Sequence, residues 1–326
     1  MKRFTSILIA AMLVASLAAC SGGSGGLGAV PTAVPTPSAD PTGADLTPAP
    51  SGATSSGSTS PSEAPGSTAT ASPSAAASAA PTTILRAYFV LGGQPGSEGL
   101  VPVLREVPQT TATGTAAMKA LLAGPTTAES GDRTIGTAIP SGTRLLGLTT
   151  KNGVATVNLS TEFDSGAGTV SMQYRLAQVV YTLTQFATVK SVIIQIEGQT
   201  VTVFGSEGIV LAGPVGRSDY VGQLPAIFVD RPANGAALGN PGRVAGNTDV
   251  FEATFRIAVI DAIGKTLVDQ QVMASCGSGC RGTFDVTVKY TVTKGQWGTL
   301  RSYDASAKDG APENVREYPV WLTPAN

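Results

Sequence analysis

The stretch from 121 to 163 reads LLAGPTTAESGDRTIGTAIPSGTRLLGLTTKNGVATVNLSTEF. Gly124-Pro125 ends a helix, because glycine accepts the left-handed conformation after the last turn and proline cannot continue the helical hydrogen bonds. Asn152-Gly153 then separates two runs of alternating polarity, residues 144–151 and 154–160. Asn-Gly accepts positive φ at both turn positions, which makes it the strongest short-range hairpin signal. The stretch therefore predicts a helix end, a loop and a β-hairpin.

Upstream of this stretch, the sequence predicts two strands and the body of the first helix. The strands cover residues 84–91 and 99–107, and the Gly92-Gly-Gln-Pro-Gly96 cluster connects them. Thr113 or Thr115 is expected to cap the helix, since a threonine oxygen can accept a bond from an unpaired amide of the first turn. The apolar residues that recur at helical spacing are Ala117, Met118, Leu121 and Leu122.

Downstream, residues 170–187 have the pattern of an amphipathic helix. Its apolar stripe consists of Met172, Leu176, Val179, Val180, Leu183 and Phe186. Its opposite, polar face consists of Gln173, Arg175, Gln178 and Gln185. The stripe is typical of a core face, and a groove for a partner is the alternative. Strands at 189–196 and 200–204, which turn around Gly198, complete a second hairpin.

The order of these elements predicts an α+β domain over residues 83–220, with an antiparallel sheet and two helices on one face. The motifs at 121–126, 138–147, 151–163 and 175–186 resemble the GerMN domain of bacterial sporulation and spore germination. The resemblance implies an envelope-associated protein without an established reaction. The GerMN fold is similar to ring-building modules of sporulation and secretion assemblies, so the resemblance also allows a homo-oligomer.

The second half of the chain, residues 224–323, reads as an all-β domain. Apolar and polar residues alternate cleanly from 251 to 259 and from 284 to 292, and period two with one apolar face indicates half-buried antiparallel strands. The expected strands are 226–230, 243–247, 250–260, 265–274, 283–293, 299–303 and 315–322. About seven short strands separated by turns predict an immunoglobulin-like β-sandwich.

Three motifs of this half resemble the immunoglobulin-like domain of bacterial spore germination. They lie at residues 244–254, 276–284 and 306–310. The chain lacks the Cys…Trp…Cys pattern that links the two sheets of antibody domains. The resemblance implies contacts at the cell surface, and it offers no catalytic residues to carry over.

The N-terminus predicts export and a lipid anchor. Lys2 and Arg3 precede an apolar run that ends in Leu17-Ala-Ala-Cys20, the layout of a signal peptide over residues 1–19. The ending is similar to a bacterial lipobox, which implies that Cys20 is lipidated and holds the protein at the outer surface of the cell membrane. An uncleaved anchor helix and ordinary cleavage are the alternatives. Residues 20–82 consist almost wholly of Ser, Thr, Ala, Gly and Pro, and this composition predicts a disordered linker.

Composition argues against several classes of function. The chain has no histidine, which removes the commonest general base and His-based zinc sites. Beyond residue 82 acidic and basic residues are equal in number, and no basic block suggests nucleic acid. No cofactor or metal is expected. Glu162 and Asp164 could serve as an acid/base pair in a cell-wall hydrolase, but they also suit an acidic turn before a helix.

These features favour a membrane-anchored, non-catalytic binding or scaffolding protein of the cell envelope, whose partner is an envelope protein or a wall polymer. Cys276 and Cys280 are expected to form a disulfide, because export is oxidising and the three residues between them allow a sharp turn. The loops that are candidates for partner contact contain Asp249, Glu252, Lys308 and Asp309. Trp297, Trp321 and Tyr303 are expected in the core or at its rim, with a carbohydrate platform as the alternative.

Overall fold

The computed structural model describes residues 80–93, 97–132, 134–166, 168–206 and 208–325. The predicted signal peptide, Cys20 and nearly all of the predicted linker lie outside these residues. The described chain begins its first strand at Thr82, the residue at which the linker was expected to end. Among the helices that the structure describes, none is long and apolar enough to span a bilayer.

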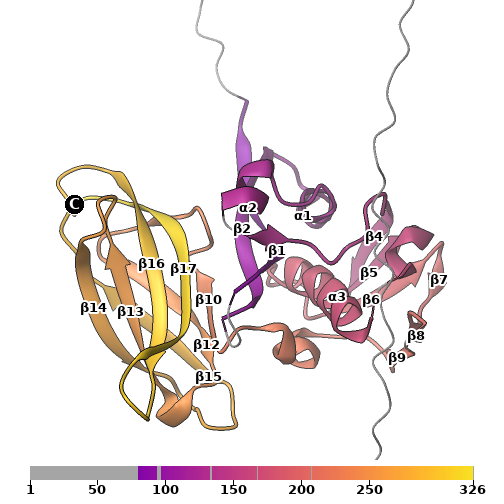
Figure 1. Ribbon diagram of the computed structural model, residues 1–326. Coiled ribbons are helices and arrows are strands. Elements are labelled where there is room, and N and C mark those ends of the chain that lie inside the picture. Colours follow the sequence, from indigo (N-terminus) through magenta and orange to yellow (C-terminus); the bar gives the residue numbers. More distant parts are fainter. Residues whose placement is uncertain (1–79, 94–96, 133, 167, 207, 326) are drawn as a thin grey trace, which may run out of the picture. The chain divides into compact units, whose positions relative to one another are not determined.

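The first half of the described chain mixes helices and strands, as predicted (Figure 1). Its elements, in order, are β1 Thr82–Leu91, β2 Gly99–Pro108, α1 Thr113–Leu122, α2 Thr127–Asp132, β3 Ile135–Gly136, β4 Leu145–Lys151, β5 Val154–Leu159, η1 Thr161–Asp164, α3 Thr169–Leu183, β6 Ser191–Ile196, β7 Gln199–Thr200, β8 Val203–Phe204, β9 Ile209–Val210 and η2 Arg217–Gln223.

The strands of this half form separate sheets, which corrects the expectation of one antiparallel sheet. One sheet has the order β2-β1-β3 and another the order β4-β5-β6-β7. β5 pairs with β6 in parallel. The reason is that α3 connects these two strands, and a helix between neighbouring strands returns the chain to the end from which it started. The α+β class is confirmed, with this one parallel pair inside it.

The predicted hairpin and helix end are confirmed. Asn152 and Gly153 both have positive φ, 50° and 82°, between β4 and β5. After α1, Gly124 has φ 79° and donates to the carbonyl of Leu121 at 3.0 Å. The predicted caps are wrong: α1 begins at Thr113, Ala112 is its N-cap, and no side chain caps it.

Helix α2 was not predicted, although the sequence contains its signal. The amide of Thr126 donates to Glu129 Oε2 at 2.8 Å, and the amide of Glu129 donates to Thr126 Oγ1 at 3.4 Å. These reciprocal bonds form a capping box, and Thr126-Thr-Ala-Glu129 has its spacing.

Helix α3 is shorter than predicted and buried nearly all round. It ends at Leu183, and Met172 and every residue from Arg175 to Leu183 is buried. The expectation that Arg175 and Gln178 lie on an exposed face is therefore wrong. Figure 1 shows α3 between the sheet that contains β1 and the sheet that contains β6, and it contacts both. Because other elements pack on several sides of α3, these residues are not exposed to solvent.

The second half is an all-β sandwich, as predicted (Figure 1). Its elements are β10 Ile227–Arg231, β11 Ala237–Leu238, β12 Gly242–Thr248, η3 Phe251–Ala253, β13 Thr254–Ile260, β14 Thr266–Met273, β15 Gly282–Val288, β16 Gln296–Ala305 and β17 Pro312–Leu322. The sheets have the orders β10-β12-β15 and β11-β17-β16-β13-β14. Their inner faces form one core, whose largest members include Phe255, Phe284 and Tyr318.

One inward position of the predicted strand 250–260 is wrong. Phe251 was expected on the apolar face, yet it is 64% exposed. Residues 251–253 form the short turn η3, and the strand begins only at Thr254. The alternation continues as predicted from Phe255 onward, where the residues return to strand geometry.

Candidate functional site

Three loops gather at one end of the sandwich, and they include both loops that the sequence singled out (Figure 1). Strand register places them there: Thr248 pairs with Gly282, Thr254 with Met273, and Arg256 with Tyr303. The connections 249–253, 274–281 and 306–311 therefore leave the sheets at the same end. We call this region the loop end.

A disulfide-closed loop holds one of these connections in place. Cys276 and Cys280 are joined, with their Cα atoms 5.8 Å apart. Between them, the amide of Gly279 donates to Asp249 Oδ1 at 3.2 Å. Ser278 Oγ accepts a bond from the amide of Glu252 at 2.9 Å. The predicted disulfide thus braces the neighbouring loop, a link that sequence reasoning missed.

Close backbone contact accompanies these bonds. A Cβ atom at position 277 would lie 2.4 Å from the amide nitrogen of Ala253, so only glycine fits there. The amide of Ser278 donates to the carbonyl of Val250 at 3.1 Å. The two loops therefore form one packed unit.

The braced loop has an unusual backbone and displays an aromatic ring. Glu252 and Ala253 have φ of 53° and 57°, a left-handed region that non-glycine residues adopt only where the surroundings impose it. Phe251, immediately before them, is largely exposed. No local sequence signal marks this turn, because neither position is Gly or Asn.

The four predicted contact residues have two different roles. Asp249 holds the disulfide loop, and Asp309 Oδ1 accepts a bond from the amide of Ala311 at 3.1 Å within its own turn. Within the described part of the chain, the side chains of Glu252 and Lys308 make no hydrogen bond or ion pair, and both are exposed. Glu252 and Lys308 are thus the members of this set that a partner can reach.

Of the two acidic residues after the hairpin, Asp164 has a structural bond. Asp164 Oδ1 accepts a bond from the amide of Gly205 at 2.7 Å, which fixes the turn after β8. A hydrogen bond from Ser160 lowers the pKa of Glu162, which is the wrong direction for a general acid. Among residues that the structure describes, no three acidic or cysteine side chains converge as metal ligands.

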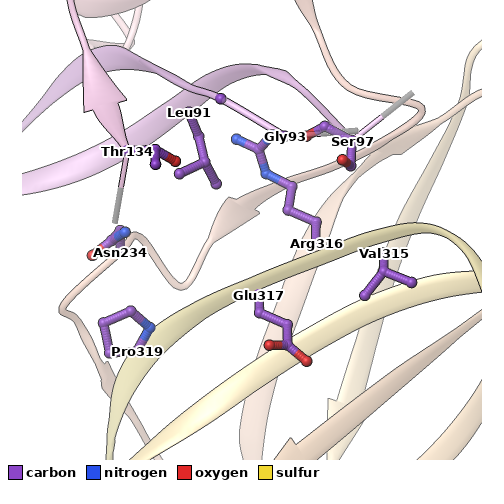
Figure 2. Close-up of a pocket in the computed structure, with 10 residues that line it drawn as sticks. Leu91, Gly93, Ser97, Thr134, Asn234, Val315, Arg316, Glu317 and Pro319 are labelled. Carbon is purple, nitrogen blue, oxygen red and sulfur yellow. Dashed lines mark hydrogen bonds between the residues drawn. The ribbon is translucent and has the colours of Figure 1, made fainter. Parts of the chain in front are cut away.

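A pocket of about 420 Å³ lies between the β1–β2 connection and β17. Figure 2 shows Arg316 reaching from β17 toward Gly93 and Ser97, whereas Glu317 points away. Arg316 is 3% exposed and donates to the carbonyls of Ser97 and Leu100, each at 2.6 Å. Burial lowers the pKa of Arg316 to about 10, so the guanidinium remains charged at neutral pH. Because its donors are used by backbone carbonyls, this group positions the β1–β2 connection.

A second polar cluster surrounds Asp230 on β10. Asp230 accepts bonds from Arg86 at 3.0 Å and from the hydroxyl of Tyr88 at 2.5 Å, and Arg217 lies 3.8 Å away. Burial, followed by the charge of Asp230, raises the pKa of Tyr88 far above its ordinary value, so Tyr88 stays protonated and donates. Sequence reasoning missed this cluster, because its members come from distant parts of the chain.

Comparison with known proteins identifies both halves. Residues 86–202 match the family described as sporulation and spore germination, and residues 226–311 match the immunoglobulin-like domain of bacterial spore germination. None of the curated proteins matches the chain.

Three solved structures are similar to parts of the chain. The first GerMN domain of the sporulation protein GerM from Bacillus subtilis has 21% identity and TM-score 0.36, covering 42% of this chain and 99% of that one. The tandem GerMN domains of GerM have 16% identity and a TM-score of 0.38, and the similarity covers 64% of this chain and 62% of that one. A structure described as a Clostridium perfringens lipoprotein has 22% identity and a TM-score of 0.31, and the similarity covers 44% of this chain and 92% of that one.

These TM-scores lie below 0.5, so the assignment rests on the two family matches. The chain carries a GerMN-type sporulation and spore germination domain, followed by the immunoglobulin-like domain of bacterial spore germination.

Proposed function

We propose that this protein is a non-catalytic binding protein of the bacterial cell envelope, and that the loop end is its contact surface. Both domains belong to germination-related families, and the N-terminus has the sequence of a lipoprotein signal. In this proposal, lipidated Cys20 holds the protein at the membrane, and residues 20–82 tether the body to it.

The main support for the proposal is that Phe251 is exposed on a loop that the disulfide-closed loop holds in place. An exposed aromatic side chain on a fixed backbone can bind without a large loss of conformational entropy. Aromatic residues, phenylalanine among them, are also enriched at protein interfaces relative to the rest of the surface. Glu252 beside it and Lys308 at the same end supply charges of both signs for the rim. The partner is an envelope protein or a wall polymer.

The test compares loop-end variants with a matched variant at the other end of the sandwich. Full-length protein carries Phe251→Ala, Glu252→Ala and Lys308→Ala together, and the control carries Ile263→Ala, whose side chain is 88% exposed in the β13–β14 turn. Chemical crosslinking in intact cells should give a discrete product for wild type and for the control, and much less of it for the triple variant. Equal yields from all three proteins would remove the loop end as the contact surface.

The mass of the crosslinked product identifies the class of partner. A product of twice the chain mass would identify a second copy of this chain, and a product that wall-digesting enzymes release would identify wall polymer. Catalysis has a separate test: purified full-length protein is incubated with wall sacculi and released fragments are measured. No release is expected. Release that Glu162→Gln abolishes would replace the binding proposal with a hydrolase.

Anchoring is tested at Cys20. The modifying chemistry requires the thiol, so Cys20→Ala should abolish incorporation of labelled fatty acid and leave the unprocessed precursor. Incorporation by the Cys20→Ala protein would contradict the anchor.

A further inference from the structure

The chain has two tryptophans, and they lie side by side on the sandwich surface. Trp297 on β16 pairs with Trp321 on β17, and their rings are 5.4 Å apart at 80°. Trp297 is 51% exposed and Trp321 is 38% exposed. Gly295 packs so closely on Trp321 that a Cβ atom there would lie 2.9 Å from the ring. The pair is therefore held in place while much of both indoles faces solvent.

The tryptophans begin a longer strip on the outer face of the five-stranded sheet. Residues along β16 alternate between the core and this face, and Trp297, Thr299, Arg301 and Tyr303 share the outer side. From the first to the last of these positions the strip is roughly 20 Å long. Pro319 and Glu317 on β17 lie opposite Thr299 and Arg301. The strip ends near the loop end.

The charges of the strip neutralise one another. Arg301 pairs with Glu317, and Arg256 pairs with Asp269 at 2.8 Å. Asp269 also accepts a bond from the hydroxyl of Tyr303 at 2.6 Å. The strip thus offers two exposed indole rings set edge to face, a line of polar groups and no net charge.

We propose that this strip binds a neutral, unbranched polysaccharide. The C–H faces of pyranose rings stack on exposed indoles, and sugar hydroxyls can bond to paired charges at their outer edges without separating them. An anionic polymer would find each cation already neutralised, and an apolar helix would have to bury the ion pairs at a cost in desolvation. This proposal rests on the proposed function for the location of the protein in the cell envelope. The strip is a different surface from the loop end.

Intrinsic fluorescence tests this site directly, because no tryptophan lies elsewhere in the chain. Full-length protein in detergent is titrated with chitohexaose, a neutral oligomer of N-acetylglucosamine. We expect a saturable change in tryptophan emission. In the Trp297→Ala variant, the emission of Trp321 reports binding. The affinity for chitohexaose should fall about tenfold or more, as removal of an anchoring tryptophan commonly causes. Trp297→Phe keeps a flat ring and should retain most of the affinity.

Thermal unfolding of each variant separates loss of binding from loss of fold, and Val170→Ala, an exposed position on α3 in the first domain, serves as the control with unchanged affinity. No emission change up to millimolar chitohexaose in folded wild-type protein would overturn the inference. Unchanged affinity in Trp297→Ala would also overturn it, and so would a concentration-dependent dimer that Trp297→Ala abolishes. If chitohexaose fails while the loop-end variants lose their crosslink, the inference falls and the proposed function stands.

Discussion

Helix α3 and strand β16 place their polar side chains in opposite ways. Arg175 of α3 is 2% exposed and donates to the carbonyls of Ala138 and Ser165, each at 3.1 Å. Arg301 of β16 lies on the outer face, paired with Glu317, and both side chains are 42% exposed. Arginine thus has two roles. The buried Arg175 holds loops together inside the first domain, whereas Arg301 remains accessible to ligands on the surface of the second domain.

The difference separates structure from function. Polar groups that are buried and fully bonded to backbone atoms fix a fold, and removing one leaves its partners unpaired. Polar groups on an exposed sheet face contribute little to folding and can meet a ligand. The comparison predicts large effects on stability in the first domain and small ones on the outer face of the second.

The largest effect is expected for Arg175→Met. It removes the donor to three carbonyls, of which that of Phe163 lies at 2.5 Å, and should lower the free energy of unfolding by about 3–5 kcal/mol. Arg301→Met is the matched change on the exposed sheet and should cost about 0.5 kcal/mol. Urea unfolding of both variants measures the difference. Similar losses of stability in the two proteins would contradict this difference between buried and exposed arginines.

Gln178→Leu should have the next largest effect. This fully buried amide accepts from the amide of Ala138 at 2.8 Å and donates to the carbonyl of Tyr88 at 3.0 Å. Leaving both groups unpaired should cost about 2–3 kcal/mol, measured in the same unfolding experiment. Gln199→Leu, at an exposed position on β7, is the control. A loss below about 1 kcal/mol for Gln178→Leu would show that these bonds contribute little.

Removing the disulfide should cost about 2 kcal/mol, because so short a closed loop removes limited entropy from the unfolded chain. The change is Cys276→Ser together with Cys280→Ser, measured by chemical unfolding against wild type with the disulfide intact. Hydrogen exchange should rise at the amides of Glu252 and Gly279, which bond across the two loops. Unchanged exchange there would contradict the bracing role.

The smallest effects concern two ion pairs and their response to pH, one largely buried, Arg105 with Glu129, and one exposed, Arg243 with Asp285. Burial alone would raise the pKa of Glu129, but bonds from Arg105 and Thr126 outweigh it and lower that pKa. The stability that Glu129 contributes is therefore present above its unfolded pKa of roughly 4.3 and is lost as pH falls through the lower folded value. Glu129→Gln should flatten that acid loss in thermal melts between pH 7 and 2. Arg243→Gln removes an exposed partner of Asp285 and should leave the melting temperature unchanged.

Local chemistry made much of the fold predictable. The Asn152-Gly153 turn and the alternation of the sandwich strands depend on residues close together in sequence, and both are confirmed. The burial of Arg175 depends on what packs on the far side of α3, which helical periodicity does not reveal. The parallel pairing of β5 with β6 followed from the helix between them, a connection that the sequence contained.

The loop end was predictable only in part. The disulfide and the two loops were expected from cysteine spacing and turn residues. The exposure of Phe251 was not, because the left-handed turn at Glu252 and Ala253 depends on the bonds from the disulfide loop. Those bonds join positions about 26 to 30 residues apart, beyond the reach of local patterns.

Photocrosslinking in intact cells, from single positions of the full-length protein, shows whether the loop end is the contact surface. A photoreactive phenylalanine analogue replaces Phe251 at the loop end or Ile263 at the opposite end of the sandwich, both exposed. We expect a discrete crosslinked product from position 251 and none from position 263. Equal products from both positions, or none from position 251 in correctly folded protein, would contradict it.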